Sequence, residues 1–216
     1  MKHTNNRTII FILLVTVNIV GTIILCACDN TESADLPWNL ILVNSKNPIP
    51  KNYEVTLTEL SNGNMVDERI YPELQQMIDS ARSAGIYPMV SEAYRTSEEQ
   101  QAIMDEKIQE FIEDGYSKRK AKKLAKNWVA APGTSEHELG LALDINSDGS
   151  LSSDSEVYGW LAENAYKYGF ILRYPQGKEN ITGISYEPWH YRYVGQEAAS
   201  EIFERQICLE EYLSGT

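Results

Sequence analysis

Two histidines lie in polar segments that glycine or proline interrupts, and each has carboxylates close by. His137 lies in the segment from Ser135 to Asp144, and His190 follows Glu187 by three residues. A catalytic zinc site needs three protein ligands, commonly imidazole nitrogens with one carboxylate, and keeps one position open for water. The two histidines can supply the nitrogens. We therefore look in the same two segments for a carboxylate ligand and a general base.

Asp144 and Glu187 are the carboxylates whose surroundings suggest such roles. Asp144 lies between apolar neighbours in an expected strand at 141–145, where a carboxylate is costly unless a partner or a metal neutralises it. Pro188 argues against a helix, so a turn entering the next strand would have to direct Glu187 and His190 toward one point. Each motif alone is weak, because an isolated histidine or a buried aspartate is more often structural. The combination of the four residues carries the argument.

The segments that hold these residues lie among short strands and amphipathic helices that alternate irregularly. This pattern predicts an α+β domain, in which helices pack around a small, mostly antiparallel sheet and the zinc site lies in a cleft over that sheet. Apolar runs and helix-start signals place the elements. We expect strands at 40–43, 87–91, 141–145, 170–174 and 189–194, and helices that begin at Pro72, at 96–99, at Ser117, at Asp154 and at Gln196, the last running to about Leu213.

The first 28 residues differ in composition from the rest of the chain. A short cationic head precedes a largely apolar run at 9–27, about as long as the roughly 20 residues that span a bilayer core. The run predicts an uncleaved signal-anchor or, because the Leu-Cys-Ala-Cys sequence ending at Cys28 resembles a lipoprotein box, a lipoprotein acylated at Cys28. Either one places the following domain outside the cytoplasm. We expect a membrane segment at 1–28, a linker at 29–38 and a catalytic domain at 39–216.

Charge and cysteine content restrict the partners. The net charge of −12 argues against non-specific nucleic-acid binding. One stretch, Lys118 to Lys126, holds six basic residues in nine; it is either a solvated helix face or a contact for anionic wall polymers or lipid head groups. Cys208 is the one cysteine beyond the first 28 residues, so no disulfide within the domain is possible.

The two histidine segments resemble a known family pattern. Ser-x-His-x-x-Gly-x-Ala-x-Asp at 135–144, followed by Glu-x-Trp-His at 187–190, is similar to the LAS (lysostaphin/D-Ala-D-Ala metallopeptidase/Sonic hedgehog) zinc metallopeptidases. That family includes D-Ala-D-Ala carboxypeptidases of the VanY type. The segments at 91–100, 163–175 and 183–195 are also similar, so the resemblance extends over nearly all of the chain beyond the first 39 residues.

The resemblance implies an activity and a role for each matching residue. It implies hydrolysis, with Zn²⁺ and without a nucleophilic serine, of the C-terminal D-Ala from peptidoglycan stem peptides or precursors that end in D-Ala-D-Ala. Such trimming would serve glycopeptide resistance or wall maturation. By position, the zinc ligands are His137, Asp144 and His190, the general base is Glu187, the group stabilising the tetrahedral intermediate is Arg95, and the substrate-binding residues are Ser135, Gln100, Tyr94 and Trp189.

Several alternatives remain open at this point. Within the same family, the chain could be an L,D-carboxypeptidase, a D,D-dipeptidase or a peptidoglycan endopeptidase. From another class, it could be a non-catalytic, zinc-stabilised module that binds the cell wall, although such a module would need neither Glu187 nor Arg95. We expect a monomer whose partners are stem peptides and, through its N-terminal segment, the membrane.

Overall fold

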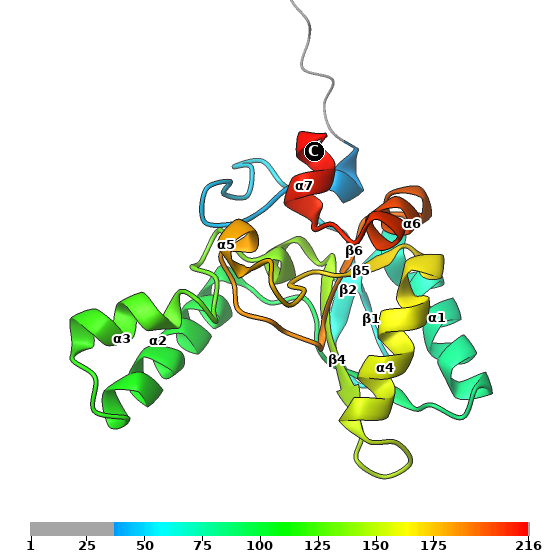
Figure 1. The fold of residues 1–216 in the computed structure, drawn as a ribbon, viewed down its shortest axis with the longest axis horizontal. Helices are drawn as coiled ribbons and strands as arrows, with labels where there is room; N and C mark the ends of the chain where they lie inside the picture. Colours follow the sequence, from blue (N-terminus) through cyan, green and yellow to red (C-terminus); the bar gives the residue numbers. More distant parts are fainter. Residues whose placement is uncertain (1–36, 216) are drawn as a thin grey trace, which may run out of the picture. The chain divides into compact units, whose positions relative to one another are not determined.

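The computed structural model describes residues 37–215 (Figure 1). The expected membrane segment at 1–28 and most of the expected linker at 29–38 lie outside these residues. Within the described range, none of the helices combines the length and apolar character that crossing a bilayer would require. The described residues thus cover nearly all of the catalytic domain expected at 39–216.

A four-stranded antiparallel sheet lies at the centre of the fold. Its strands follow the order β3-β4-β6-β5, and each neighbouring pair is antiparallel. A separate antiparallel hairpin, β1-β2, has no counterpart among the expected strands. The α+β class with small antiparallel sheets is therefore confirmed. The strands are β1 (Leu57–Glu59), β2 (Met65–Asp67), β3 (Pro88–Glu92), β4 (Ala142–Ser147), β5 (Phe170–Leu172) and β6 (His190–Tyr193).

Helices lie on both sides of this sheet (Figure 1). The helices α1 and α4 lie together on one side, whereas α2 and α3 form a pair that projects away on the other. The α-helices are α1 (Tyr71–Ser83), α2 (Ser97–Glu113), α3 (Lys118–Ala125), α4 (Asp154–Asn164), α5 (Glu179–Thr182), α6 (Gln196–Arg205) and α7 (Leu209–Ser214). Short 3₁₀ helices are η1 (Trp38–Leu40), η2 (Glu68–Ile70), η3 (Glu136–Leu139) and η4 (Ala165–Tyr168).

Alternation along the two central strands separates the core from the polar face. Leu143 and Ile145 of β4 are fully buried in the main hydrophobic core, and Tyr191 of β6 joins them. Successive side chains on a strand point to opposite faces, so Asp144 and His190 lie on the other face. The register of β4 and β6 pairs Asp144 directly with His190. The sheet thus brings a carboxylate and an imidazole from distant segments side by side.

The strand expected at 40–43 is absent. The 3₁₀ helix η1 occupies Trp38–Leu40, and irregular backbone follows. Arg192 donates from Nη2 to the carbonyl oxygens of Asn39 and Ile41, at 3.1 and 2.9 Å. These carbonyls are satisfied by a buried side chain in place of a neighbouring strand, while the apolar side chain of Val43 is still fully buried.

One expected helix boundary is wrong, and Asp154, expected from the sequence as the cap of the helix at that position, is its first residue instead. The helix expected from Gln196 to Leu213 is two helices, because Gln206 adopts a left-handed conformation with φ of 53° and ends α6. Ser153, and not Asp154, caps α4: its hydroxyl accepts from the backbone of Glu156, whose carboxylate returns to Ser153 in a capping box.

Candidate metal and catalytic site

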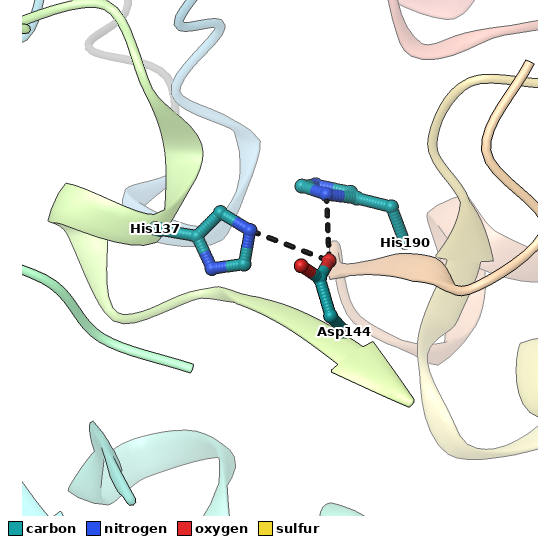
Figure 2. Close-up of side chains that lie close together, drawn as sticks. All are labelled: His137, Asp144 and His190. Carbon is teal, nitrogen blue, oxygen red and sulfur yellow. Dashed lines mark ion pairs between the residues drawn. The ribbon is translucent and has the colours of Figure 1, made fainter. Parts of the chain in front are cut away.

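His137, Asp144 and His190 converge on one point from three elements (Figure 2). They come from η3, β4 and the first residue of β6, respectively. One ligand atom from each lies within 4.8 Å of the other two. Asp144 Oδ1 is 3.4 Å from His137 Nε2 and 3.1 Å from His190 Nδ1. The arrangement offers two nitrogens and one carboxylate oxygen to a single ion.

Local backbone geometry holds His137 in place. Gly140 ends η3 in a left-handed conformation with φ of 71°, and a Cβ there would come within 3.0 Å of the backbone nitrogen of Asp67. Only glycine combines this conformation with so close an approach at low cost. His137 Nδ1 donates to the carbonyl of Ala93 at 2.7 Å, because a carbonyl oxygen can only accept. That hydrogen bond leaves the Nε2 lone pair directed at Asp144.

The donor set fits a zinc ion. Asp144 Oδ1 is buried without a hydrogen-bond partner among the described residues, although two imidazoles lie close to it. Such an atom is costly unless another group, such as a metal, satisfies it. Burial lowers the pKa of His137 and so favours the neutral imidazole that a ligand must be, although the charge of Asp144 opposes that shift in part. Two imidazole nitrogens with one carboxylate are a known ligand set of catalytic zinc sites.

The pKa of Asp144 also suits a ligand role. Burial by itself would raise this pKa, but the imidazoles of His137 and His190 outweigh burial and hold it well below its ordinary value. Asp144 therefore stays ionised at neutral pH, the form in which a carboxylate binds a metal.

Glu187 and Arg95 lie beside the three candidate ligands. Glu187 Oε2 is 3.6 Å from His190 Nδ1. Burial raises the pKa of Glu187 to about 8, the charge of Asp144 adds to the rise, and Arg95 opposes it. Arg95 Nη2 lies 3.6 Å from Asp144 Oδ2, and its Nε lies 3.3 Å from Glu92 Oε2. A carboxyl group that titrates near neutrality can accept and return a proton, and a permanently charged guanidinium suits a developing oxyanion.

These five side chains line one cleft of about 390 Å³. Ser135, Gln100 and Trp189 line it as well, whereas Tyr94 is not among the lining residues. Gln100 is only 1% exposed, and its amide is occupied: it donates to the carbonyl of Ala130 at 2.7 Å and accepts from Arg95 at 3.3 Å. The structure thus brings together every candidate residue except Tyr94, and it gives Gln100 contacts that orient Arg95.

Sequence reasoning missed a buried group of charges next to the site, here called the ionic cluster: Glu136, Arg173, Arg192 and Glu210. Arg173 Nε and Arg192 Nη1 each lie 2.8 Å from Glu136 Oε1, and Arg173 also binds Glu210 of α7 at 2.8 Å. Both arginines are fully buried. A signal was present, because each arginine stands in an apolar or aromatic strand segment, where it requires a buried partner.

Sequence reasoning also missed one wall of the cleft. Glu92 is the last residue of β3, and the remaining residues come from α2 and from the segment after α3. Apolar side chains one helical turn apart are usually core residues, so their spacing alone does not mark them as lining a site. The lining residues concerned are Glu92, Ile103, Lys107, Trp128 and Val129.

Known proteins have sequences similar to that of this chain. A family model described as "VanY: D-alanyl-D-alanine carboxypeptidase" matches residues 63–196. A "D-alanyl-D-alanine carboxypeptidase" of Enterococcus faecalis is 59% identical over 177 residues, which cover 82% of this chain and 66% of that protein. One of the same name from Enterococcus faecium is 34% identical over 198 residues, which cover 85% of this chain and 60% of that protein. The chain thus spans somewhat less than two thirds of the length of these two relatives.

Solved structures agree in fold with this one. A point mutant of the "vancomycin resistance D,D-pentapeptidase VanY" in complex with Zn(II) is 59% identical, with a TM-score of 0.81, and the match covers 82% of this chain and 99% of that one. "VanYB in complex with D-Alanine-D-Alanine" is 58% identical, with a TM-score of 0.82, over 82% of this chain and 98% of that one. The resemblance deduced from the histidine segments is confirmed, and the chain belongs to the VanY family of D-alanyl-D-alanine carboxypeptidases.

Proposed function

We propose that this protein is a zinc-dependent D,D-carboxypeptidase that removes the terminal D-Ala from peptidoglycan stem peptides or precursors ending in D-Ala-D-Ala. The observation that carries the proposal is the convergence of His137, Asp144 and His190 in a cleft that also holds Glu187 and Arg95. The relative from Enterococcus faecalis, named for this activity, and the complex of VanYB with D-Ala-D-Ala support the choice of substrate.

The residues of the cleft have separate roles in the proposed hydrolysis. His137, Asp144 and His190 would hold the zinc ion, which when bound polarises a substrate carbonyl and acidifies a water molecule. Glu187 takes the proton of the attacking water as the new C–O bond forms, and it delivers that proton to the leaving amine as the C–N bond breaks. Arg95 donates hydrogen bonds to the oxyanion that develops in the transition state.

The cleft needs no covalent intermediate. Ser135 lines it but is only 4% exposed, and neither candidate histidine ligand is placed as its base: His137 Nδ1 is bound to Ala93, and His137 Nε2 and His190 Nδ1 face Asp144. A serine nucleophile needs an adjacent base within hydrogen-bond reach. The proposed reaction is therefore indifferent to β-lactams, which act by acylating such a serine.

Mass spectrometry of products tests the proposal. The full chain, loaded with zinc, would be incubated with stem tri-, tetra- and pentapeptides and with free D-Ala-D-Ala. We expect the pentapeptide to lose one D-Ala and the tripeptide to remain intact. If no stem peptide loses a residue, the proposal fails and the wall-binding module takes its place.

A second candidate is L,D-carboxypeptidase activity on tetrapeptides. The solved structure of the LdcB LD-carboxypeptidase is 36% identical with a TM-score of 0.67, which favours this reading over an endopeptidase. The same assay separates the two, because an L,D-enzyme converts the tetrapeptide to the tripeptide and leaves the pentapeptide intact. Cleavage of free D-Ala-D-Ala would instead indicate a D,D-dipeptidase.

We also propose that the N-terminal segment tethers the domain outside the cytoplasm, through an anchor or an acylated Cys28. The apolar run at 9–27 supports this, together with a substrate that is part of the cell wall. There the enzyme would remove the last D-Ala and so destroy the D-Ala-D-Ala terminus that glycopeptide antibiotics recognise. Protease added to intact protoplasts should digest the domain, and full protection would contradict the tether. Labelled palmitate on Cys28 would distinguish lipoprotein from anchor.

A further inference from the structure

The pair of helices α2 and α3 forms an arm with its own small core (Figure 1). Met104 of α2 packs with Ala125 and Val129, and each of these side chains is at most 9% exposed. A capping box from Thr96 to Glu99 starts α2. The arm is therefore a packed unit with a fixed conformation, and it contributes one wall of the catalytic cleft.

Trp128 stands on that wall, in the segment that follows α3. Its side chain is 45% exposed, yet it lines the cleft together with Ile103 of α2. Hydrogen bonds hold the backbone on both sides of it: the carbonyl of Asn127 accepts from Ser185 at 2.7 Å, and that of Ala130 accepts from Gln100 at 2.7 Å. The indole is thus presented to the cleft from a rigid support.

The two ends of the cleft differ in exposure and chemistry. At the catalytic end, Glu187, His190 and Arg95 are at most 8% exposed, and every group is polar or charged. Among the residues of the arm that line the cleft, the exposed side chain is the indole of Trp128, and the one cation, Lys107, is ion-paired with Glu110. The arm side is therefore an open side of the cleft, and it offers an apolar surface in place of a free charge.

The position of the scissile bond determines which part of the substrate passes the arm. If the scissile bond lies at the buried polar end, the part of the peptide upstream of it must leave the cleft past the arm. The two terminal alanines carry only methyl groups, which do not require an indole. An aromatic face at a rim binds long aliphatic side chains well, because it buries much apolar area at little entropic cost.

We propose that Trp128 and Ile103 form a subsite for the aliphatic side chain of the residue that precedes the terminal D-Ala-D-Ala. The inference rests on the proposed function and names its substrate more closely: a stem peptide with a long side chain at that position, in preference to free or simply acylated D-Ala-D-Ala. The subsite acts on binding and does not touch the reacting atoms.

The test compares two substrates on the zinc-loaded full chain: a diacetyl-lysyl-D-Ala-D-Ala peptide and N-acetyl-D-Ala-D-Ala. For Trp128→Ala, the ratio of kcat/KM for the longer peptide to that for the shorter one should fall about tenfold, mainly through KM. Tyr116→Ala is the matched control, since Tyr116 is 40% exposed on the same arm but does not line the cleft. It should leave the ratio within twofold.

A binding measurement separates this subsite from the proposed reaction. Calorimetry with the diacetyl-lysyl-D-Ala product should show about tenfold weaker binding to Trp128→Ala than to the wild type, with Trp128→Phe in between. If binding shows this pattern while no substrate is hydrolysed, the subsite stands and the assigned reaction fails. If Trp128→Ala changes neither the ratio nor the binding, or weakens both substrates equally, the subsite is overturned.

Discussion

The candidate zinc site and the ionic cluster are both buried, and both place carboxylates next to cations. In the ionic cluster the ion pairs that bind Arg173 and Arg192 to carboxylates measure 2.8 Å. In the candidate site the distances between carboxylates and cations or imidazoles run from 3.1 to 3.6 Å, and Asp144 Oδ1 has no hydrogen-bond partner in the described structure. Glu136 Oε2 of the ionic cluster also lacks a hydrogen-bond partner, so the difference lies in the length of the contacts and in the cleft. Close pairing makes a buried charge structural, whereas the longer contacts along a cleft leave atoms available to a metal and a substrate.

The two groups are neighbours along the chain as well. Glu136 directly precedes His137, and Arg192 follows His190 by two residues on the same face of β6. The ionic cluster therefore connects η3 to β6, and through Glu210 it also secures α7. Its short contacts fix the backbone on which the longer contacts of the catalytic site depend.

The largest expected effect distinguishes the candidate zinc site from the ionic cluster: a substitution in the zinc site should abolish catalysis without lowering stability. Glu187→Gln keeps the shape of the side chain but cannot accept a proton, so kcat should fall by about 10²–10⁴. Measured with the stem pentapeptide, this loss should occur with zinc content and melting temperature close to those of the wild type. Near-normal turnover with zinc bound would show that Glu187 is not the base.

The opposite result is expected for the ionic cluster. Glu136→Ala leaves two buried guanidinium groups without their shared carboxylate, which typically costs about 3–5 kcal/mol of unfolding free energy. Urea unfolding measures this loss, and Glu136→Gln provides a variant that retains the side chain's volume. Glu138→Gln, on the same 3₁₀ helix but bound only to the backbone of Gly133, is the control. If Glu138→Gln lost as much unfolding free energy as Glu136→Gln, the ionic cluster would contribute no more to stability than an ordinary hydrogen bond on the same helix.

Removing the metal should affect stability only through the three candidate ligands. Zinc that binds the folded state alone stabilises it by about 2.7 kcal/mol when its concentration is 100 times its Kd. A chelator should therefore lower the melting temperature of the wild type, and added zinc should restore it. The double variant His137→Ala/His190→Ala should not respond to either treatment. A zinc response retained in that variant would place the metal elsewhere.

The smallest expected effect is a difference in acid stability. Burial by itself would raise the pKa values of Glu136 and Glu210, but Arg173, joined at Glu136 by Arg192, helps to hold both below the ordinary value of 4.5. A lowered folded-state pKa contributes stability above pH 4.5, and this contribution is lost as the pH falls through the folded-state pKa values. Unfolding free energy should thus decrease below pH 4.5 in the wild type and less steeply in Glu210→Gln. If the unfolding free energies of the wild type and Glu210→Gln fell equally with decreasing pH, Glu210 would not be a source of the acid sensitivity.

Much of the candidate site could be predicted because its signals are local. The spacing of His137 and Asp144 around Gly140, and of Glu187 and His190 around Pro188, lies within ten residues in each segment. The capping box that starts α2 and the Pro72 near the start of α1 are likewise short-range signals, and the structure has both. Interactions between residues a turn apart depend little on the remaining fold, so residue types alone reveal them.

Only the tertiary structure decided which distant segments meet. The register that pairs Asp144 with His190, the side chain of Arg192 that replaces a strand partner for Ile41, and the place of Trp128 on the cleft wall join parts of the chain far apart in sequence. A shift of one residue in the register would turn Asp144 into the core, and no local preference forbids that shift. The packing of the whole sheet against α1 and α4 opposes that shift, because a slip of one residue would take Leu143 and Ile145 out of the core face.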